Sequence, residues 1–149
     1  MGTAEPRTCS IARTLDVVGE KWALLALREV FLGDRRFDEM VRRTGAPRDT
    51  LAARLRTLVA AGILERRPYC EHPARYEYHL TAAGRDLYPV IVTLMRWGDK
   101  YLAGEQGPPL VLRHHCGHQL TAQLICQACG EPLHARDTKP MTAATSAGI

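Results

Sequence analysis

Residues 63–81, ILERRPYCEHPARYEYHLT, have the pattern of strands and stand among helix-like segments. From 75 to 80 polar residues alternate strictly with Tyr, Tyr and Leu, which is typical of a half-buried strand. Residues 63–69 are its expected partner, and residues 70–74, with Pro73, are the expected turn. The stretch therefore predicts a two-stranded hairpin in a largely helical chain.

Five apolar-periodic segments flank this hairpin and predict five helices. Each has an apolar face, and short breaks with Gly or Pro separate most of them. Pro47 suits a first helical turn, where its missing N–H is no loss, and Thr81 can cap the last helix. The apolar face of that last helix is wider than one small domain needs to cover. The predicted helices are residues 9–18, 21–32, 37–44, 47–61 and 82–102.

This order of elements is that of a winged helix-turn-helix. The third and fourth predicted helices are joined by TGAP, and a three- to four-residue turn with glycine is what a helix-turn-helix uses. The sequence therefore predicts a mainly α (α+β) fold over residues 9–103. Its parts are a recognition helix at 47–61, a two-stranded wing at 63–80 and a long C-terminal helix.

The recognition helix and the wing carry residues suited to DNA. Arginine can bind guanine through two hydrogen bonds, threonine can meet the thymine methyl group, and the N-terminal residues of a recognition helix lie deepest in the major groove. Basic residues near the wing tip would contact phosphates or a minor groove. An ordinary solvated, arginine-rich face is the alternative. The candidate DNA-binding residues are Arg48, Asp49, Thr50, Arg54, Arg56, Thr57, Arg66, Arg67, His72 and Arg75.

Several motifs in residues 9–102 resemble the HxlR-type winged-helix transcription regulators. They are a Cys before the first helix, GEKWALLALRE, GDRRFDEM, TLAARLRTLVAAGILER, YEYHLTAAGRDL and a late WGDKYL. The resemblance implies a homodimer built from the first and last helices. It also implies binding to a short inverted repeat in double-stranded promoter DNA, usually with repression. The chain departs from the family at Gly45 and Ala46, where a Ser or Thr commonly caps the recognition helix.

The resemblance also makes Cys9 a candidate redox sensor. Some members of the family sense electrophiles or oxidants through a cysteine at this position, near the start of the first helix. The dipole of a helix favours a thiolate there. The alternative is an ordinary cysteine at a dimer interface.

A second, cysteine-rich region follows a Gly- and Pro-containing linker at 104–112. In residues 113–134 the sequence CQAC followed by Gly has the form of a zinc knuckle, and Cys116–Gly117 echoes it. A histidine must complete a four-ligand site, with His114, His115 and His118 as candidates. The prediction is structural zinc in a zinc-ribbon-like segment, bound by Cys116, His118, Cys126 and Cys129. A redox or metal-sensing cluster and a metal-free tail are the alternatives.

Composition limits the other possibilities. The net charge of +4 is compatible with a polyanionic partner. No signal peptide or membrane span is visible, so we expect a cytoplasmic protein with reduced thiols. The odd number of cysteines, 5, favours metal or thiol chemistry over a disulfide framework. Residues 1–8 are expected to be flexible and residues 135–149 to be a disordered tail.

Two classes of function remain after these observations. The leading one is a dimeric, sequence-specific DNA-binding regulator. The other is a winged-helix interaction module whose zinc ribbon docks a protein partner, and a steep salt dependence would distinguish DNA binding from it. The chain shows no triad-like set, no Gly-rich phosphate loop and no pair of acids that stands out in an apolar setting, so we expect no enzyme. The sequence does not identify an effector.

Overall fold

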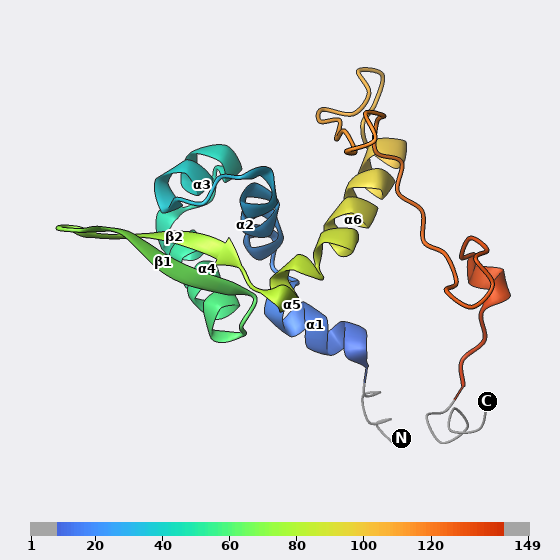
Figure 1. The fold of residues 1–149 in the computed structure, drawn as a ribbon, viewed down its shortest axis with the longest axis horizontal. Helices are drawn as coiled ribbons and strands as arrows, with labels where there is room; N and C mark the ends of the chain where they lie inside the picture. The colour runs from blue at the N-terminus through green and yellow to red at the C-terminus, as the bar shows by residue number, and fades with distance from the viewer. Residues whose placement is uncertain (1–8, 142–149) are drawn as a thin grey trace, which may run out of the picture. The chain divides into compact units, whose positions relative to one another are not determined.

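A computed structural model describes residues 9–141 of the chain. It confirms the predicted winged helix-turn-helix with a two-stranded antiparallel wing (Figure 1). Backbone contacts divide the chain into two compact units, one ending at Met95 and one beginning at Arg96. In order, the elements are α1 (Ser10–Val18), α2 (Lys21–Leu32), α3 (Phe37–Thr44), α4 (Arg48–Ala60), β1 (Leu64–Glu71), β2 (Ala74–Leu80), α5 (Ala82–Arg85), α6 (Tyr88–Tyr101) and a 3-10 turn η1 (Ala135–Asp137).

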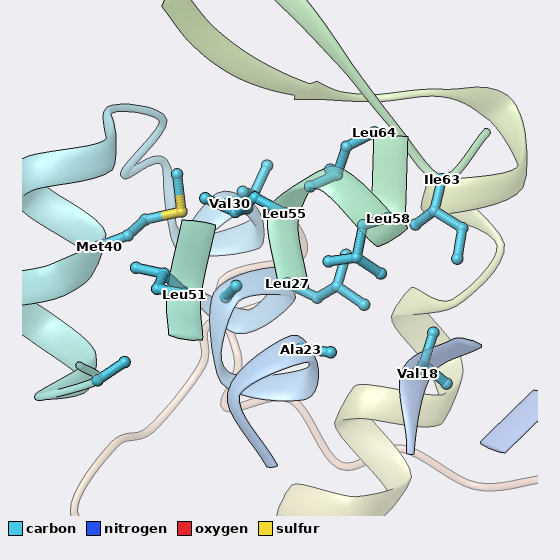
Figure 2. Close-up of a cluster of buried hydrophobic side chains, with 12 residues drawn as sticks. Val18, Ala23, Leu27, Val30, Met40, Leu51, Leu55, Leu58, Ile63 and Leu64 are labelled. Atoms are coloured by element: carbon cyan, nitrogen blue, oxygen red, sulfur yellow. The ribbon is translucent and has the colours of Figure 1, made fainter. Parts of the chain in front are cut away.

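The core of the first unit lies where α4 crosses α2. Leu51, Leu55 and Leu58 are fully buried, and their spacing of four and three residues puts them on one face of α4. They meet Leu27 of α2 in a cluster that also takes in residues of α3 and β1 (Figure 2). The opposite face of α4 is therefore the one that remains for solvent or a partner.

The turn between α3 and α4 is built from glycine and a threonine hydroxyl. Gly45 has a φ of 71°, a left-handed conformation that favours glycine. The Thr44 hydroxyl donates to the Met40 carbonyl at 2.7 Å and accepts from the Ala46 N–H at 3.2 Å. Pro47 is the N-cap and not the first helical residue, and its side chain makes no cap. Thr44 thus supplies the turn with a hydroxyl from the end of α3, while Ala46 is buried against the core.

The end of α4 turns the chain directly into the wing. The Ile63 N–H donates to the Leu58 carbonyl at 2.9 Å, and Gly62 adopts a φ of 72°. This is the Schellman ending, in which a left-handed residue lets later N–H groups satisfy the last helical carbonyls. Because Ile63 is itself buried, the ending also fixes where β1 starts.

The two strands of the wing are longer, and the turn between them is tighter, than predicted. β1 continues to Glu71 and β2 begins at Ala74, so only His72 and Pro73 form the turn in place of the predicted residues 70–74. The strand register shifts between Pro68 and Cys70. A proline has no N–H to give to the ladder, and such residues are confined to edges and irregularities of a sheet. The irregularity is thus absorbed inside β1, and pairing resumes beyond it.

The single helix predicted over residues 82–102 is wrong: α5 ends at Arg85 and α6 begins at Tyr88. Pro89 explains the break, because its ring would clash with the carbonyl of Arg85 and it has no N–H to give to that carbonyl. The predicted cap is confirmed. The Thr81 hydroxyl accepts a hydrogen bond from the Gly84 N–H at 3.1 Å.

The second unit contains the end of α6 and the cysteine-rich segment. From Arg96 to Met141 no residue is buried. None of the helices found between residues 9 and 141 is long and apolar enough to cross a membrane.

Candidate nucleic-acid interface and cysteine-rich segment

Arg48 lies at the first position of α4 and is held from α3. Its Nη2 donates to Oδ1 of Asp38 at 2.7 Å, and its guanidinium lies 4.9 Å from the centre of the Phe37 ring. Both charged side chains are mostly exposed, at 61% and 78%. The pair therefore orients Arg48 and leaves its guanidinium accessible to another anion.

The remaining candidates on α4 differ in their accessibility. Asp49, Arg56 and Thr57 are exposed, and Thr50 is half-buried. Arg54 is also half-buried, and its Nε is enclosed without a hydrogen-bond partner among residues 9–141. A buried, unpaired donor costs free energy, so the head group of Arg54 is less freely available than that of Arg56.

The wing presents its basic residues in two ways. Arg66 lies over the Tyr76 ring, 4.6 Å from its centre, and Arg67 donates from Nε to the Glu65 carboxylate at 2.8 Å. His72 and Arg75 are exposed beside the turn at the wing tip. The cross-strand aromatic contact holds the guanidinium of Arg66 on one face of the ribbon.

Sequence reasoning missed Arg36, which ties the wing to the start of α3. Its Nε donates to Oε1 of Glu77 at 3.1 Å, and the guanidinium lies 4.2 Å from the centre of the Tyr69 ring. Next to this pair the Tyr78 N–H donates to the carbonyl of Arg35 at 2.8 Å. The hydrogen bond from Arg36 lowers the pKa of Glu77, against a smaller opposing effect of burial. No local pattern in the sequence signals this pairing, because 41 residues separate the partners.

Cys9 occupies the N-cap of α1, close to where the sequence placed it. Its carbonyl accepts the first hydrogen bond of the helix, from the Arg13 N–H at 3.1 Å, and the residue is half-buried. Among residues 9–141 all five cysteines are free thiols.

The cysteine-rich segment forms two separate turns, each with a cysteine followed by a left-handed glycine. In the first, Cys116 Sγ lies 3.7 Å from Nδ1 of His118, and Gly117 has a φ of 91°. In the second, Gly130 has a φ of 76°. The backbone N–H groups of Cys129 and Ala128 donate to the Cys126 sulfur and, with the Cys129 side chain, lower the pKa of that thiol.

The four predicted zinc ligands are not gathered at one point. Within the described range of 9–141, no three His, Cys, Asp or Glu residues are placed so as to hold a metal ion together. The predicted zinc ribbon is therefore not shown. The structure instead places the ligands in two pairs, one on each turn.

Apolar side chains are exposed on the two helices expected to form a dimer. Ile11 and Leu15 of α1 are 69% and 55% exposed, and Leu94 of α6 is 53% exposed. Val90, one turn before Leu94, is exposed as well. Exposed apolar side chains one turn apart on a helix commonly mark a site of protein association.

Comparison with known proteins agrees with this architecture. Residues 17–106 match the family described as HxlR-like helix-turn-helix. The chain is 53% identical over 132 residues to the uncharacterized HTH-type transcriptional regulator Rv3095 of Mycobacterium tuberculosis, covering 88% of this chain and 84% of that protein.

Solved structures show the same likeness. The crystal structure of PA1607, named as a candidate transcription factor, superposes with a TM-score of 0.80 at 34% identity, covering 94% of this chain and 99% of that one. The redox regulator HypR in its oxidized form superposes with a TM-score of 0.57 at 35% identity, covering 62% of this chain and 96% of that one.

Proposed function

The chain belongs to the HxlR-like helix-turn-helix family, and from this premise we propose that it is a dimeric, sequence-specific DNA-binding regulator that represses transcription. In this proposal α4 enters the major groove of each half of an inverted repeat, and the wing contacts the adjacent backbone. The function is binding and not catalysis.

One observation carries the proposal: the face of α4 opposite its buried leucines has short, polar and basic side chains. Arg56 and Thr57 are exposed there and Arg48 is exposed at the start of the helix, while Leu51 and Leu55 fill the core. Guanidinium and hydroxyl groups on the exposed side of a recognition helix suit base edges and phosphates in a major groove. The exposed Arg66 and Arg75 of the wing would add phosphate contacts.

The test is selection of binding sites from a random duplex library, followed by titration of the selected duplex by fluorescence anisotropy. We expect an inverted repeat to be enriched, with affinity falling steeply as salt concentration rises. Enrichment of no sequence, together with salt-insensitive binding to a protein partner, would favour the alternative of a winged-helix interaction module.

We further propose that residues 113–134 bind structural zinc through Cys116, His118, Cys126 and Cys129. Support comes from the donor set, since three thiols and an imidazole suit Zn²⁺, and from the glycine that follows a cysteine in each turn. Elemental mass spectrometry of the untagged protein tests it, and about one ion per chain is expected. Protein that purifies without metal and does not bind added Zn²⁺ would contradict it.

Cys9 is a second candidate for regulation, by oxidants. Its place at the N-cap of α1 and the likeness to a protein named as a redox regulator favour this reading. Oxidant treatment should then weaken binding of the selected duplex by the wild type and leave the Cys9→Ser variant unchanged. Equal loss in both proteins would assign the effect to other thiols.

A further inference from the structure

The starting observation is that each turn of the cysteine-rich segment holds only half of a metal site. Zinc–sulfur and zinc–nitrogen bonds of about 2.0–2.3 Å require the ligand atoms to lie within about 4 Å of one another. The first pair, Cys116 and His118, meets that requirement at 3.7 Å. The second pair, Cys126 and Cys129, lies on a turn closed by a hydrogen bond from the Gly130 N–H to the Cys126 carbonyl at 2.7 Å. The pairs do not combine into one group anywhere in residues 9–141.

The chain between the two pairs does not fold back on itself. Each turn is closed by its own short-range bonds: the Leu120 N–H donates to Leu112 at 2.7 Å, and the Leu133 N–H donates to Leu124 at 3.0 Å. Between the turns, Arg96 of α6 holds the Ala122 carbonyl through Nη1 at 2.6 Å. Figure 1 shows the chain leaving the first turn (orange) and running on before it forms the second (red).

The connection between the two pairs is long enough to separate them when it is extended. The nine residues between Cys116 and Cys126 can span about 30 Å at about 3.3 Å per residue. The second pair is thus presented on an arm that reaches away from the first pair of its own chain.

The arm also lacks a core of its own. Leu124 and Ile125, which precede the second pair, are 53% and 52% exposed, and no residue from Arg96 to Met141 is buried. A segment this short cannot bury a sufficient core alone. In a two-fold dimer each contact is made twice, so the surface that one arm covers on the partner has an equivalent that the partner's arm covers. Both arms can therefore be covered at once.

We propose that two copies of this chain exchange these arms, so that Cys116 and His118 of one copy and Cys126 and Cys129 of the other bind the same zinc ion. This inference rests on the dimer and the zinc of the proposed function. A dimer then holds two shared ions, and each ion displaces three thiol protons to solvent with no change of oxidation state. The site is incomplete in a single copy.

Complementation between two inactive variants tests the exchange. One variant carries Cys116→Ser and His118→Gln, the other Cys126→Ser and Cys129→Ser. The two are co-expressed with different tags, and the heterodimer is isolated by two affinity steps. With exchanged arms it contains one complete ligand set and one empty set, so we expect about one tightly bound zinc per heterodimer, half of the wild-type content, and none in either homodimer.

The alternative outcomes separate the proposals. A zinc-loaded wild type with a zinc-free heterodimer overturns the exchange, because ligands from one chain leave both sites broken. A zinc-free wild type overturns the zinc site itself. Should a variant fail to fold, dilution of the wild type into a chromophoric chelator decides the point. Zinc is released together with dimer dissociation if it is shared, and it remains in the monomer if it is not.

Discussion

Arg48 and Asp38 join the two helices of the helix-turn-helix through a single hydrogen bond of 2.7 Å from Nη2 to Oδ1. Both partners are exposed, so the pair contributes little to stability. It holds the guanidinium in one orientation at the start of α4. A guanine edge or a phosphate has the geometry to replace the carboxylate. In the proposed complex the pair would therefore position Arg48 before DNA binds.

Arg48→Ala should therefore affect specific binding most. Loss of a two-hydrogen-bond contact to a base costs about 1–3 kcal/mol, so affinity for the selected duplex should fall by about 5- to 150-fold. Affinity for random DNA should fall much less. Anisotropy titrations of both duplexes measure the ratio, with Arg136→Ala, outside the helix-turn-helix, as a charge-matched control. An equal loss on both duplexes would make Arg48 a phosphate contact.

Arg66→Ala should weaken binding to both kinds of duplex by similar factors. Its guanidinium lies on the wing over Tyr76, where a phosphate contact carries no sequence information. The slope of log affinity against log salt should become shallower by about 1. Titrations of the wild type and the variant across a salt series measure this, and an unchanged slope would remove Arg66 from the interface.

Glu77 should make stability depend on pH in the acid range. Its folded-state pKa is lowered from the ordinary value of 4.5, chiefly by the hydrogen bond from Arg36. The stabilisation is therefore present above about pH 4.5 and is lost as pH falls through the lowered folded-state pKa. Urea unfolding should show Glu77→Gln less stable than the wild type near neutral pH, with the difference closing in acid.

The control for that experiment is Glu71→Gln at the wing tip, because Glu71 makes no ion pair within the described residues. Its difference from the wild type should stay flat over the same pH range. If Glu77→Gln behaved in the same way, the link between the wing and α3 would contribute nothing to acid sensitivity.

Leu15→Asp or Leu94→Asp should weaken the proposed dimer without unfolding the chain. Both side chains are more than half exposed, so their loss removes little from the core. Burying an unpaired carboxylate at an interface is costly, and the dimer dissociation constant should rise by more than tenfold. Sedimentation equilibrium measures it. Leu32→Asp, also at an exposed leucine but on α2, is the matched control and should leave assembly unchanged.

Gly84→Ala should destabilise the first unit. A Cβ at this buried position would lie 2.2 Å from the Ile63 carbonyl oxygen and 3.1 Å from Leu80 Cδ2, so the backbone would have to shift. Overpacking of this kind costs about 1–3 kcal/mol. Gly98→Ala in α6 is the control, since its Cβ would meet nothing within 4 Å, and it should be neutral or stabilising by about 1 kcal/mol. Urea unfolding compares the two.

The sequence alone predicts those elements that depend on residues close together in the chain. The leucines at 51, 55 and 58 predict the buried face of α4, and the alternation before Thr81 predicts β2, because each follows from the period of its own element. The break at Pro89 could also have been predicted, because a proline cannot continue the preceding helical turn. The long apolar pattern around Pro89 favoured one continuous helix instead.

Features that depend on distant residues could not be predicted in this way. Arg36 meets Glu77 only after the wing has folded against the start of α3. The enclosure of the Arg54 Nε likewise depends on how α4 packs, although its helical position alone suggested an open face. Spacing indicated four metal ligands near one another, and it could not show that no three of them lie together within residues 9–141.

The exposed segment from Arg96 to Met141 has a consequence for the lifetime of the protein in the cell. A protease needs an extended, accessible stretch of backbone, and residues 121–124 between the two turns offer one that neither helix nor sheet protects. A copy without a partner would be open to cleavage there. If pairing covers this stretch, degradation removes single copies and spares assembled ones, so the amount of regulator is set by pairing as well as by synthesis.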